Sequence, residues 1–208
     1  MSTHVDEFLP TRKSLLTRLK SWDDQDGWRE FFDTYWKLIY SVGRKAGFTD
    51  AEAQDLVQET MLSVAKKMHG FKYEPAIGSF KAWLLLNVRS RIADHLRKRN
   101  AVSRPQFADG DKTELLDAAV DRSVHDLEGI WEEEWQRNLL EVALQNVKSG
   151  VSPRQFQIFE LYVLQELPLG ILTSRLGVNI GQIYLAKHRV SQLLKKEVKR
   201  LEAKSNGG

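Results

Sequence analysis

Apolar residues recur at three- and four-residue intervals along most of the chain, which is the spacing of a helix face packed against a core. No segment alternates apolar and polar residues convincingly enough to indicate a strand. The pattern predicts helices over residues 12–20, 28–45, 50–68, 80–99, 129–150, 153–164, 168–177 and 181–201. The sequence therefore predicts an all-α protein.

Three of these helices carry an apolar stripe that is expected to face a core. In the helix at residues 28–45 the stripe consists of Phe31, Phe32, Tyr35, Leu38, Ile39 and Val42. In the helix at residues 50–68 the inward positions are Leu56, Met61 or Thr60, Val64 and Ala65. In the helix at residues 80–99 they are Leu85, Val88, Ile92 and Leu96.

Capping residues support these helix starts. Residues 49–52 form a capping box, in which the hydroxyl of Thr49 and the carboxylate of Glu52 can satisfy free backbone amides. Residues 152–155 repeat this pattern, with proline at the first helical position. Ser79 is placed to cap the helix that follows it.

Pro105 and Gly110 interrupt the helical pattern, and the stretch that follows, up to about residue 128, is acidic with weak periodicity. We interpret residues 101–128 as a flexible acidic linker. It would join two small helical domains, at residues 28–100 and 129–204, and residues 1–27 would form an N-terminal extension.

Charge is distributed unevenly, although the net charge is only +3. Residues 1–100 hold 17 basic and 13 acidic side chains, residues 101–135 hold 3 and 10, and residues 136–208 hold 11 and 5. The two basic ends could each form a surface that binds a polyanion. The acidic segment between them would be repelled by the same polyanion. Two solvated domains joined by an acidic spacer would give the same counts.

The residue types argue against an enzyme. The chain has no cysteine, which excludes disulfides, zinc–thiolate sites and cysteine nucleophiles. The five histidines are scattered, and no glycine-rich phosphate loop is present. Residues 132–134 are glutamates that point in different directions on a helix, which indicates a solvated face rather than a carboxylate pair. We therefore expect neither a catalytic site nor a metal or cofactor.

The sequence also lacks the signals of export or membrane insertion. The first residues are not followed by the apolar core of a signal peptide. No apolar run approaches the roughly 20 residues that span a bilayer. We therefore expect a cytoplasmic protein without membrane insertion.

Residues 168–196 have the spacing of a helix-turn-helix. Gly177 occupies the turn, where a positive φ is required. Four apolar residues are placed to set the angle between the two helices: Leu172, Leu176, Val178 and Ile183. The other side of the last helix carries side chains that can contact base edges and phosphates. This favours binding in the DNA major groove. A basic solvated helical hairpin would show the same pattern.

The segment at residues 50–100 resembles the core-binding and promoter-melting domain of bacterial RNA polymerase sigma factors of the sigma-70 family. The resemblance is carried by Asp-Leu-Val-Gln-Glu at residues 55–59, by Phe-x-x-Trp-Leu at residues 80–84 and by Asp-x-Leu-Arg at residues 94–97. Residues 152–194 resemble the promoter-reading domain of the same family. Two domains with a short linker are similar to the extracytoplasmic-function (ECF) group of this family.

The resemblance implies a sigma factor that binds core RNA polymerase, recognises two promoter elements and helps to open DNA. It implies that Asp55, Gln58 and Glu59 bind the clamp helices of polymerase. The residues implied for the minus-ten element are Tyr73, Trp83, Asn87, Ser90, Arg91, His95, Arg97 and Lys98. Those implied for the minus-thirty-five element are Gln182, Tyr184, Leu185, Lys187, His188, Arg189 and Lys195. Core packing is the alternative role for Trp83 and Tyr73.

The resemblance further implies that the acidic linker lies in the positively charged RNA exit path of polymerase, and that an anti-sigma protein is a candidate partner. Two other functions fit parts of the sequence. A stand-alone DNA-binding regulator would use the helix-turn-helix without polymerase. A nucleic-acid-processing enzyme would need clustered carboxylates, or a nucleophile with a base, and the sequence offers neither pattern.

Overall fold

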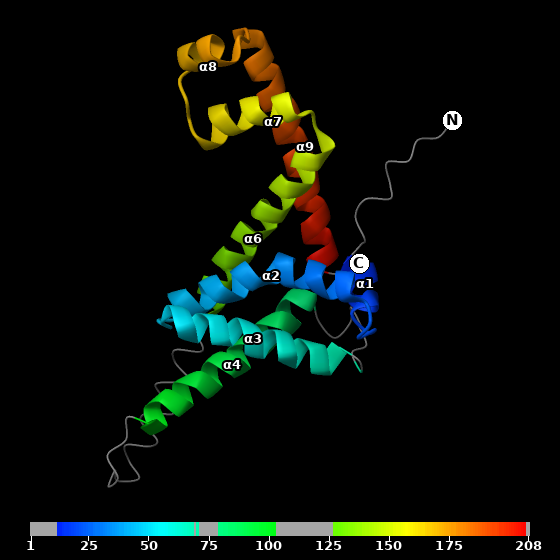
Figure 1. The fold of residues 1–208 in the computed structure, drawn as a ribbon, viewed down its shortest axis with the longest axis vertical. Helices are drawn as coiled ribbons and strands as arrows, with labels where there is room; N and C mark the ends of the chain where they lie inside the picture. Colours follow the sequence, from blue (N-terminus) through cyan, green and yellow to red (C-terminus); the bar gives the residue numbers. More distant parts are fainter. Residues whose placement is uncertain (1–11, 69, 71–78, 103–126, 207–208) are drawn as a thin grey trace. The chain divides into compact units, whose positions relative to one another are not determined.

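A computed structural model describes residues 12–68, 70, 79–102 and 127–206 of the chain. Every regular element in these ranges is a helix, which confirms the predicted all-α class (Figure 1). The helices are α1 Arg12–Arg18, α2 Gln25–Lys45, α3 Asp50–Met68, α4 Phe80–Val102, α6 Leu127–Gly150, α7 Pro153–Phe159, the π-helical turn η1 Glu160–Leu164, α8 Leu169–Leu176 and α9 Ile180–Asn206. The predicted linker lies largely outside the described residues, and Tyr73 lies wholly outside them.

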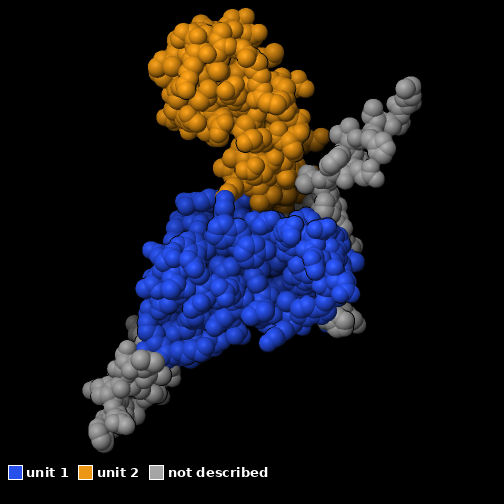
Figure 2. Space-filling model, viewed as in Figure 1, with its two compact units in different colours: residues 1–138, 204–208 blue, residues 139–203 orange. Residues whose placement is uncertain are grey.

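The chain divides into two compact units (Figure 2). Unit 1 comprises Met1–Asn138 with Lys204–Gly208, and unit 2 comprises Leu139–Ala203. Residues 129–138, which the sequence analysis placed at the start of the C-terminal domain, lie in unit 1.

The core of unit 1 forms between α2, α3 and α4. Its buried side chains from these helices include Phe31, Tyr35, Leu38, Ile39, Val42, Ala53, Leu56, Val57, Thr60, Val64, Met68, Phe80, Leu84, Val88, Ile92 and Leu96. At Gly43 an added Cβ would lie 2.8 Å from Cδ2 of Leu56, so glycine permits the close approach of α2 and α3.

Three predicted core positions, Phe32, Ala65 and Leu85, are not fully buried, and of the alternatives Met61 and Thr60 it is Thr60 that is buried. Phe32 is 44 % exposed, because it lies at the edge of the stripe, where it stacks on Trp36 at 6.2 Å. In α4, Leu84 is fully buried whereas Leu85 is half-buried, and in α3 Thr60 is buried whereas Met61 is half-buried. Both members of each pair fit helical spacing, so only the neighbouring helices decide which of them is covered.

The predicted caps are present in unit 1. The amide of Thr49 donates to Oε2 of Glu52 at 2.8 Å, and the amide of Glu52 donates to Oγ1 of Thr49 at 3.3 Å. This reciprocal pair confirms the capping box at the start of α3. The amide of Ala82 donates to Oγ of Ser79 at 3.2 Å, which confirms the cap of α4.

Unit 2 is organised around α9. One buried cluster joins α7, α8 and α9 through Ile158, Leu172, Val178, Ile183 and Ala186, with Leu176 packed against it. The four residues predicted to set the angle between α8 and α9 therefore lie in or against this cluster. A second cluster joins Val147, Phe159 and Val190. Ser152 caps α7 by accepting a hydrogen bond from the amide of Gln155.

The turn between α8 and α9 depends on Gly177, which has a φ of 60° and a ψ of 38°. A side chain in this left-handed conformation is strained. A guanidinium nitrogen of Arg154 donates to the carbonyl oxygen of Leu176 at 2.6 Å and so satisfies the end of α8.

Replacing Gly177 with alanine is expected to lower the free energy of unfolding of unit 2 by about 1–2 kcal/mol, because alanine must adopt a positive φ there. Gly170 is the matched control, since a Cβ at this position in α8 meets nothing within 4 Å. Gly170→Ala should raise stability by roughly 0.5–1 kcal/mol. Chemical denaturation followed by circular dichroism measures both, and equal shifts for the two variants would contradict this account.

Candidate functional surfaces

The first candidate surface is the outer face of α3. Asp55 and Gln58 are exposed, and Leu62, one turn beyond Gln58, is 61 % exposed. These side chains are three or four residues apart and therefore share a face. Leu62 was not among the predicted residues, although its spacing from Gln58 could have indicated it.

Glu59, the third predicted residue of this face, is turned toward α4. One of its carboxylate oxygens lies 3.1 Å from Nε2 of His95, and both side chains are partly buried. The His95 ring also packs 5.5 Å from the ring of Phe48. The structure therefore joins a residue predicted to bind polymerase to one predicted to bind DNA.

Asn87 also connects α3 and α4. Its side chain is 2 % exposed, its Nδ2 donates to the carbonyl of Trp83 at 2.8 Å, and its Oδ1 accepts from Nζ of Lys67 at 2.6 Å. The helical spacing placed Asn87 beside the apolar face of α4. The structure shows in addition that Asn87 is buried and that its hydrogen bond with Lys67 connects α4 to α3. A DNA contact by Asn87 would require these hydrogen bonds to break.

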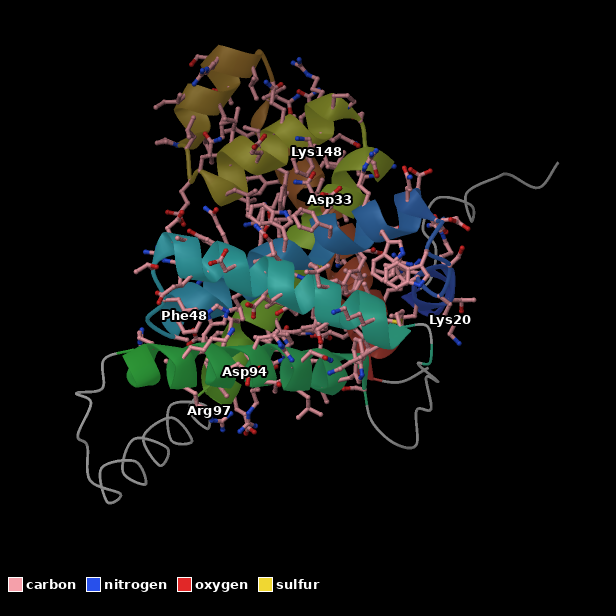
Figure 3. The ribbon with its side chains drawn as sticks, turned by 60° about the horizontal axis from the view of Figure 1, so that its bottom comes forward. Lys20, Asp33, Phe48, Asp94, Arg97 and Lys148 are labelled. Carbon is pink, nitrogen blue, oxygen red and sulfur yellow. The ribbon has the colours of Figure 1, made fainter. Side chains whose placement is uncertain are left out.

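The solvent-facing side of α4 carries other predicted residues. Ser90, Arg97 and Lys98 are exposed, and Figure 3 shows Arg97 directed away from α3. Arg91 is half-buried and lies 3.4 Å from the carboxylate of Asp94. Leu86 is 63 % exposed. Leu86 was not among the predicted residues, although its four-residue spacing from Ser90 could have indicated this face.

Trp83 is half-buried at the start of α4. Its ring lies 5.7 Å from the ring of the buried Phe80. Trp83 therefore packs on the core with part of its surface and presents the remainder to solvent.

The second candidate surface is the first half of α9 in unit 2. The side chains predicted to read DNA are all exposed here: Gln182, Tyr184, Leu185, Lys187, His188, Arg189 and Lys195. Two large side chains with apolar surface lie among the charged ones: Tyr184 is 49 % exposed and Leu185 is 66 % exposed. Exposed cations beside such surfaces can contact phosphates and base edges together.

Gln182 has a structural role that the sequence analysis missed. Its Oε1 accepts from the amide of Asn179 at 2.9 Å, and its own amide donates to Oδ1 of Asn179 at 2.8 Å. Asn179 and Gln182 thus form a capping box at the start of α9. The Asn-x-x-Gln spacing at residues 179–182 is visible in the sequence and resembles the two boxes that were recognised.

Tyr184 and Lys187 both rest on Tyr162 of η1. The two tyrosine rings meet edge to face at 6.0 Å, and Nζ of Lys187 lies 5.5 Å from the centre of the Tyr162 ring. A hydrogen bond with Tyr184 raises the pKa of Tyr162 above its ordinary value. These contacts restrict the rotamers of two predicted DNA-binding residues, and no spacing in the sequence reveals them.

Two further findings concern the described part of the chain. None of its His, Asp and Glu side chains form a group of three or more that could hold a metal ion. None of its helices is both long enough and apolar enough to cross a membrane.

Comparison with known proteins identifies the segment that contains the α3 and α4 surfaces. Residues 31–102 match the family model for sigma-70 region 2. The chain is also similar to a probable RNA polymerase sigma factor of Haemophilus influenzae, with 32 % identity over 89 residues. Residues 31–102 therefore carry a sigma-70 region 2. The similarity to the Haemophilus protein covers 43 % of this chain and 41 % of that protein, so the chain spans about two fifths of the length of this relative.

The segment that matches region 2 runs from within α2 to the end of α4. The predicted residues of α3 and α4 therefore all lie within the matched segment, whereas those of α9 lie outside it. Membership of the ECF group stays a prediction.

Proposed function

We propose that the chain is a sigma factor that binds core RNA polymerase, recognises two promoter elements and helps to open DNA. The observation that supports this most is the match of residues 31–102 to sigma-70 region 2, combined with an exposed, mixed acidic and apolar face on α3. The chain would recognise the promoter, while the polymerase would catalyse RNA synthesis. It would act in the cytoplasm, where it meets polymerase and DNA.

The α3 face is the proposed contact with the clamp helices of polymerase. Asp55 provides a negative charge and Gln58 a carboxamide, while Leu62 provides an apolar side chain beside them. An apolar anchor within a charged rim is the usual composition of a protein interface. Glu59 contributes through its contact with His95, which holds α3 against the DNA-facing helix.

The solvent-facing side of α4 is the proposed minus-ten surface. Arg97 and Lys98 would neutralise phosphates, and Ser90 and Trp83 would contact bases. Separating bases costs a few kcal/mol for each unstacked base. Stacking on aromatic side chains can offset this by about 1–3 kcal/mol per base. Tyr73 lies outside the described residues, and its role in this step is a proposal from the sequence alone.

The proposed minus-thirty-five surface is α9, preceded by α8 and the turn at residues 177–179. Arg189 would read a base edge in the major groove, and Lys187 and Lys195 would contact phosphates. The ring of Tyr162, which also packs against the ring of Tyr184, lies under Nζ of Lys187 and restricts its direction.

The run-off transcription assay tests this function directly. Purified full-length chain and core polymerase are incubated on a promoter library, and we expect transcripts to start at a defined subset of promoters. Absence of both core binding and initiation would reject the proposal. The stand-alone regulator would instead bind DNA without binding core polymerase, and the match to region 2 favours the sigma factor over it.

Replacing Arg189 with alanine should lower run-off transcription by about 5–100-fold at a promoter whose minus-thirty-five element is recognised, because one good base contact contributes about 1–3 kcal/mol. Lys199→Ala, which removes another exposed cation of α9, is the matched control and should change transcription less than about twofold. Equal losses for the two variants would mean that α9 binds DNA only through its overall charge.

A further inference from the structure

The first two turns of α9 expose three large side chains with apolar surface. These are Ile180, Tyr184 and Leu185, and Leu185 is the most exposed of them at 66 %. Ile180 and Tyr184 are four residues apart, and Leu185 directly follows Tyr184, so the three side chains lie on one side of the helix. Gly181 adds no side chain on the same side. We call Ile180, Tyr184 and Leu185 the apolar patch.

Polar groups beside the apolar patch are already bonded within the protein. A side-chain hydrogen bond joins Tyr184 to Tyr162 of η1, and the two rings meet edge to face at 6.0 Å. The carboxamide oxygen of Gln182 accepts from the amide of Asn179 at 2.9 Å. A bidentate contact of glutamine with adenine uses the same oxygen, so it would compete with this cap. The start of α9 therefore offers a partner mainly apolar surface.

Cationic side chains border the apolar patch. Residues 180–196 contain three lysines and one arginine and no acidic residue. Lys187 and Arg189 are exposed two and four residues beyond Leu185. Nζ of Lys187 lies 5.5 Å from the centre of the Tyr162 ring, so one ring contacts both Lys187 and Tyr184. An apolar patch with a cationic border is complementary to the DNA major groove, where phosphates flank the base edges.

The major groove presents one markedly apolar group on its base edges, which is the C5-methyl group of thymine. In a helix-turn-helix, the N-terminal residues of the second helix contact these edges. An apolar side chain that covers a hydrogen-bonding group removes water from it without replacing the lost hydrogen bond, which is unfavourable. The apolar patch therefore fits thymine better than any other base at the base pair that it covers.

We propose that Leu185, flanked by Tyr184, recognises the C5-methyl group of a thymine in the minus-thirty-five element. This inference rests on the proposed sigma-factor function and adds the chemical group that the start of α9 selects. Leu185 contacts the methyl group, and the ring of Tyr184, held by Tyr162, excludes water beside it. Lys187 and Arg189 supply the phosphate and base-edge contacts that position the helix.

Deletion of single methyl groups from a promoter tests this. A promoter that the full-length chain and core polymerase transcribe is assembled from synthetic strands, in which one thymine of the minus-thirty-five element at a time is replaced by uracil. Uracil has the same hydrogen-bonding groups as thymine and lacks only the C5-methyl group. At limiting holoenzyme, at least one replacement should lower run-off transcription about 3–5-fold, the factor expected for one methyl group lost from an apolar contact. Uracil at a thymine upstream of the element is the matched control and should have no effect.

Variants of α9 identify the side chain that detects the methyl group. With Leu185→Ala, transcription from the thymine template should fall to that from the uracil template, so the two differ less than about 1.5-fold. Leu193→Ala is the matched control, since Leu193 is an exposed leucine further along the same helix. It should preserve the 3–5-fold difference. Comparing two templates with one protein cancels any change in the folded or active fraction.

The outcomes separate the two proposals. If the chain initiates but no uracil replacement in the element lowers transcription more than about 1.5-fold, methyl recognition is rejected and the sigma-factor function stands. If Leu185→Ala lowers transcription from both templates by the same factor, the apolar patch serves another partner, and recognition by Leu185 is rejected. If the natural chain neither binds core polymerase nor initiates, the sigma-factor function fails, and methyl recognition in a promoter fails with it.

Discussion

Replacing Trp135 with alanine is expected to lower the free energy of unfolding of unit 1 by about 3–5 kcal/mol. The side chain is 1 % exposed, and its ring contacts those of Tyr35 and Trp131. Its removal leaves a cavity that neighbouring rings fill only in part, and it weakens the packing of the first half of α6, residues 127–138, on the core of unit 1. Denaturant unfolding followed by far-ultraviolet circular dichroism measures the effect without relying on tryptophan fluorescence.

Trp22→Ala is the matched control for this experiment. Trp22 is 58 % exposed and stacks on Trp28 at 6.0 Å, so its loss should cost less than about 1 kcal/mol. Because the chain has two units, two transitions can occur. Trp135→Ala should shift the transition of unit 1, and Gly177→Ala should shift that of unit 2. Equal, small losses for Trp135→Ala and Trp22→Ala would mean that the first half of α6 does not pack on the core of unit 1 in solution.

Reversing the charge of Asp55 is expected to weaken binding to core polymerase by about 10–100-fold, because like charges placed opposite each other cost several kcal/mol. Asp55 is exposed on the α3 face, beside Gln58 and one turn from Glu59. A fluorescence-anisotropy titration of labelled Asp55→Arg chain with core polymerase measures the affinity. Run-off transcription at limiting protein should fall by a similar factor.

Asp33→Arg makes the same change of charge at another exposed helical position, on α2 (Figure 3). It should alter polymerase affinity less than about twofold, because an isolated surface charge has little effect. If both variants lose affinity equally, net charge rather than the α3 face controls the association, and the proposed clamp contact is wrong.

The helix starts and the turn in unit 2 could be predicted from the sequence. The capping boxes at residues 49–52, the cap at Ser152 and the turn at Gly177 all depend on residues within a few positions of one another. The same kind of pattern at Asn179 and Gln182 was overlooked, although it is equally local.

Which side chains are exposed and free of contacts within the protein could be predicted less completely from the sequence. Asn87 fits a polar stripe by spacing, yet its side chain is buried and accepts a hydrogen bond from Lys67, 20 residues earlier. Glu59 fits the α3 face, yet His95, 36 residues later, draws it toward α4. In both cases the position of the residue on its helix was predicted correctly. Its environment, however, depends on a contact with a residue that is distant in the sequence.

The sequence by itself determined the all-α class, the approximate helix positions and the motifs of region 2, because periodicity, caps and glycine conformations are set by neighbours along the chain. Only the tertiary structure decided that Leu84 rather than Leu85 is buried, that Asn87 links two helices, and that Trp131 and Trp135 complete the core of unit 1. Burial and pairing depend on helices that approach from distant parts of the sequence, and no local pattern records which face they cover.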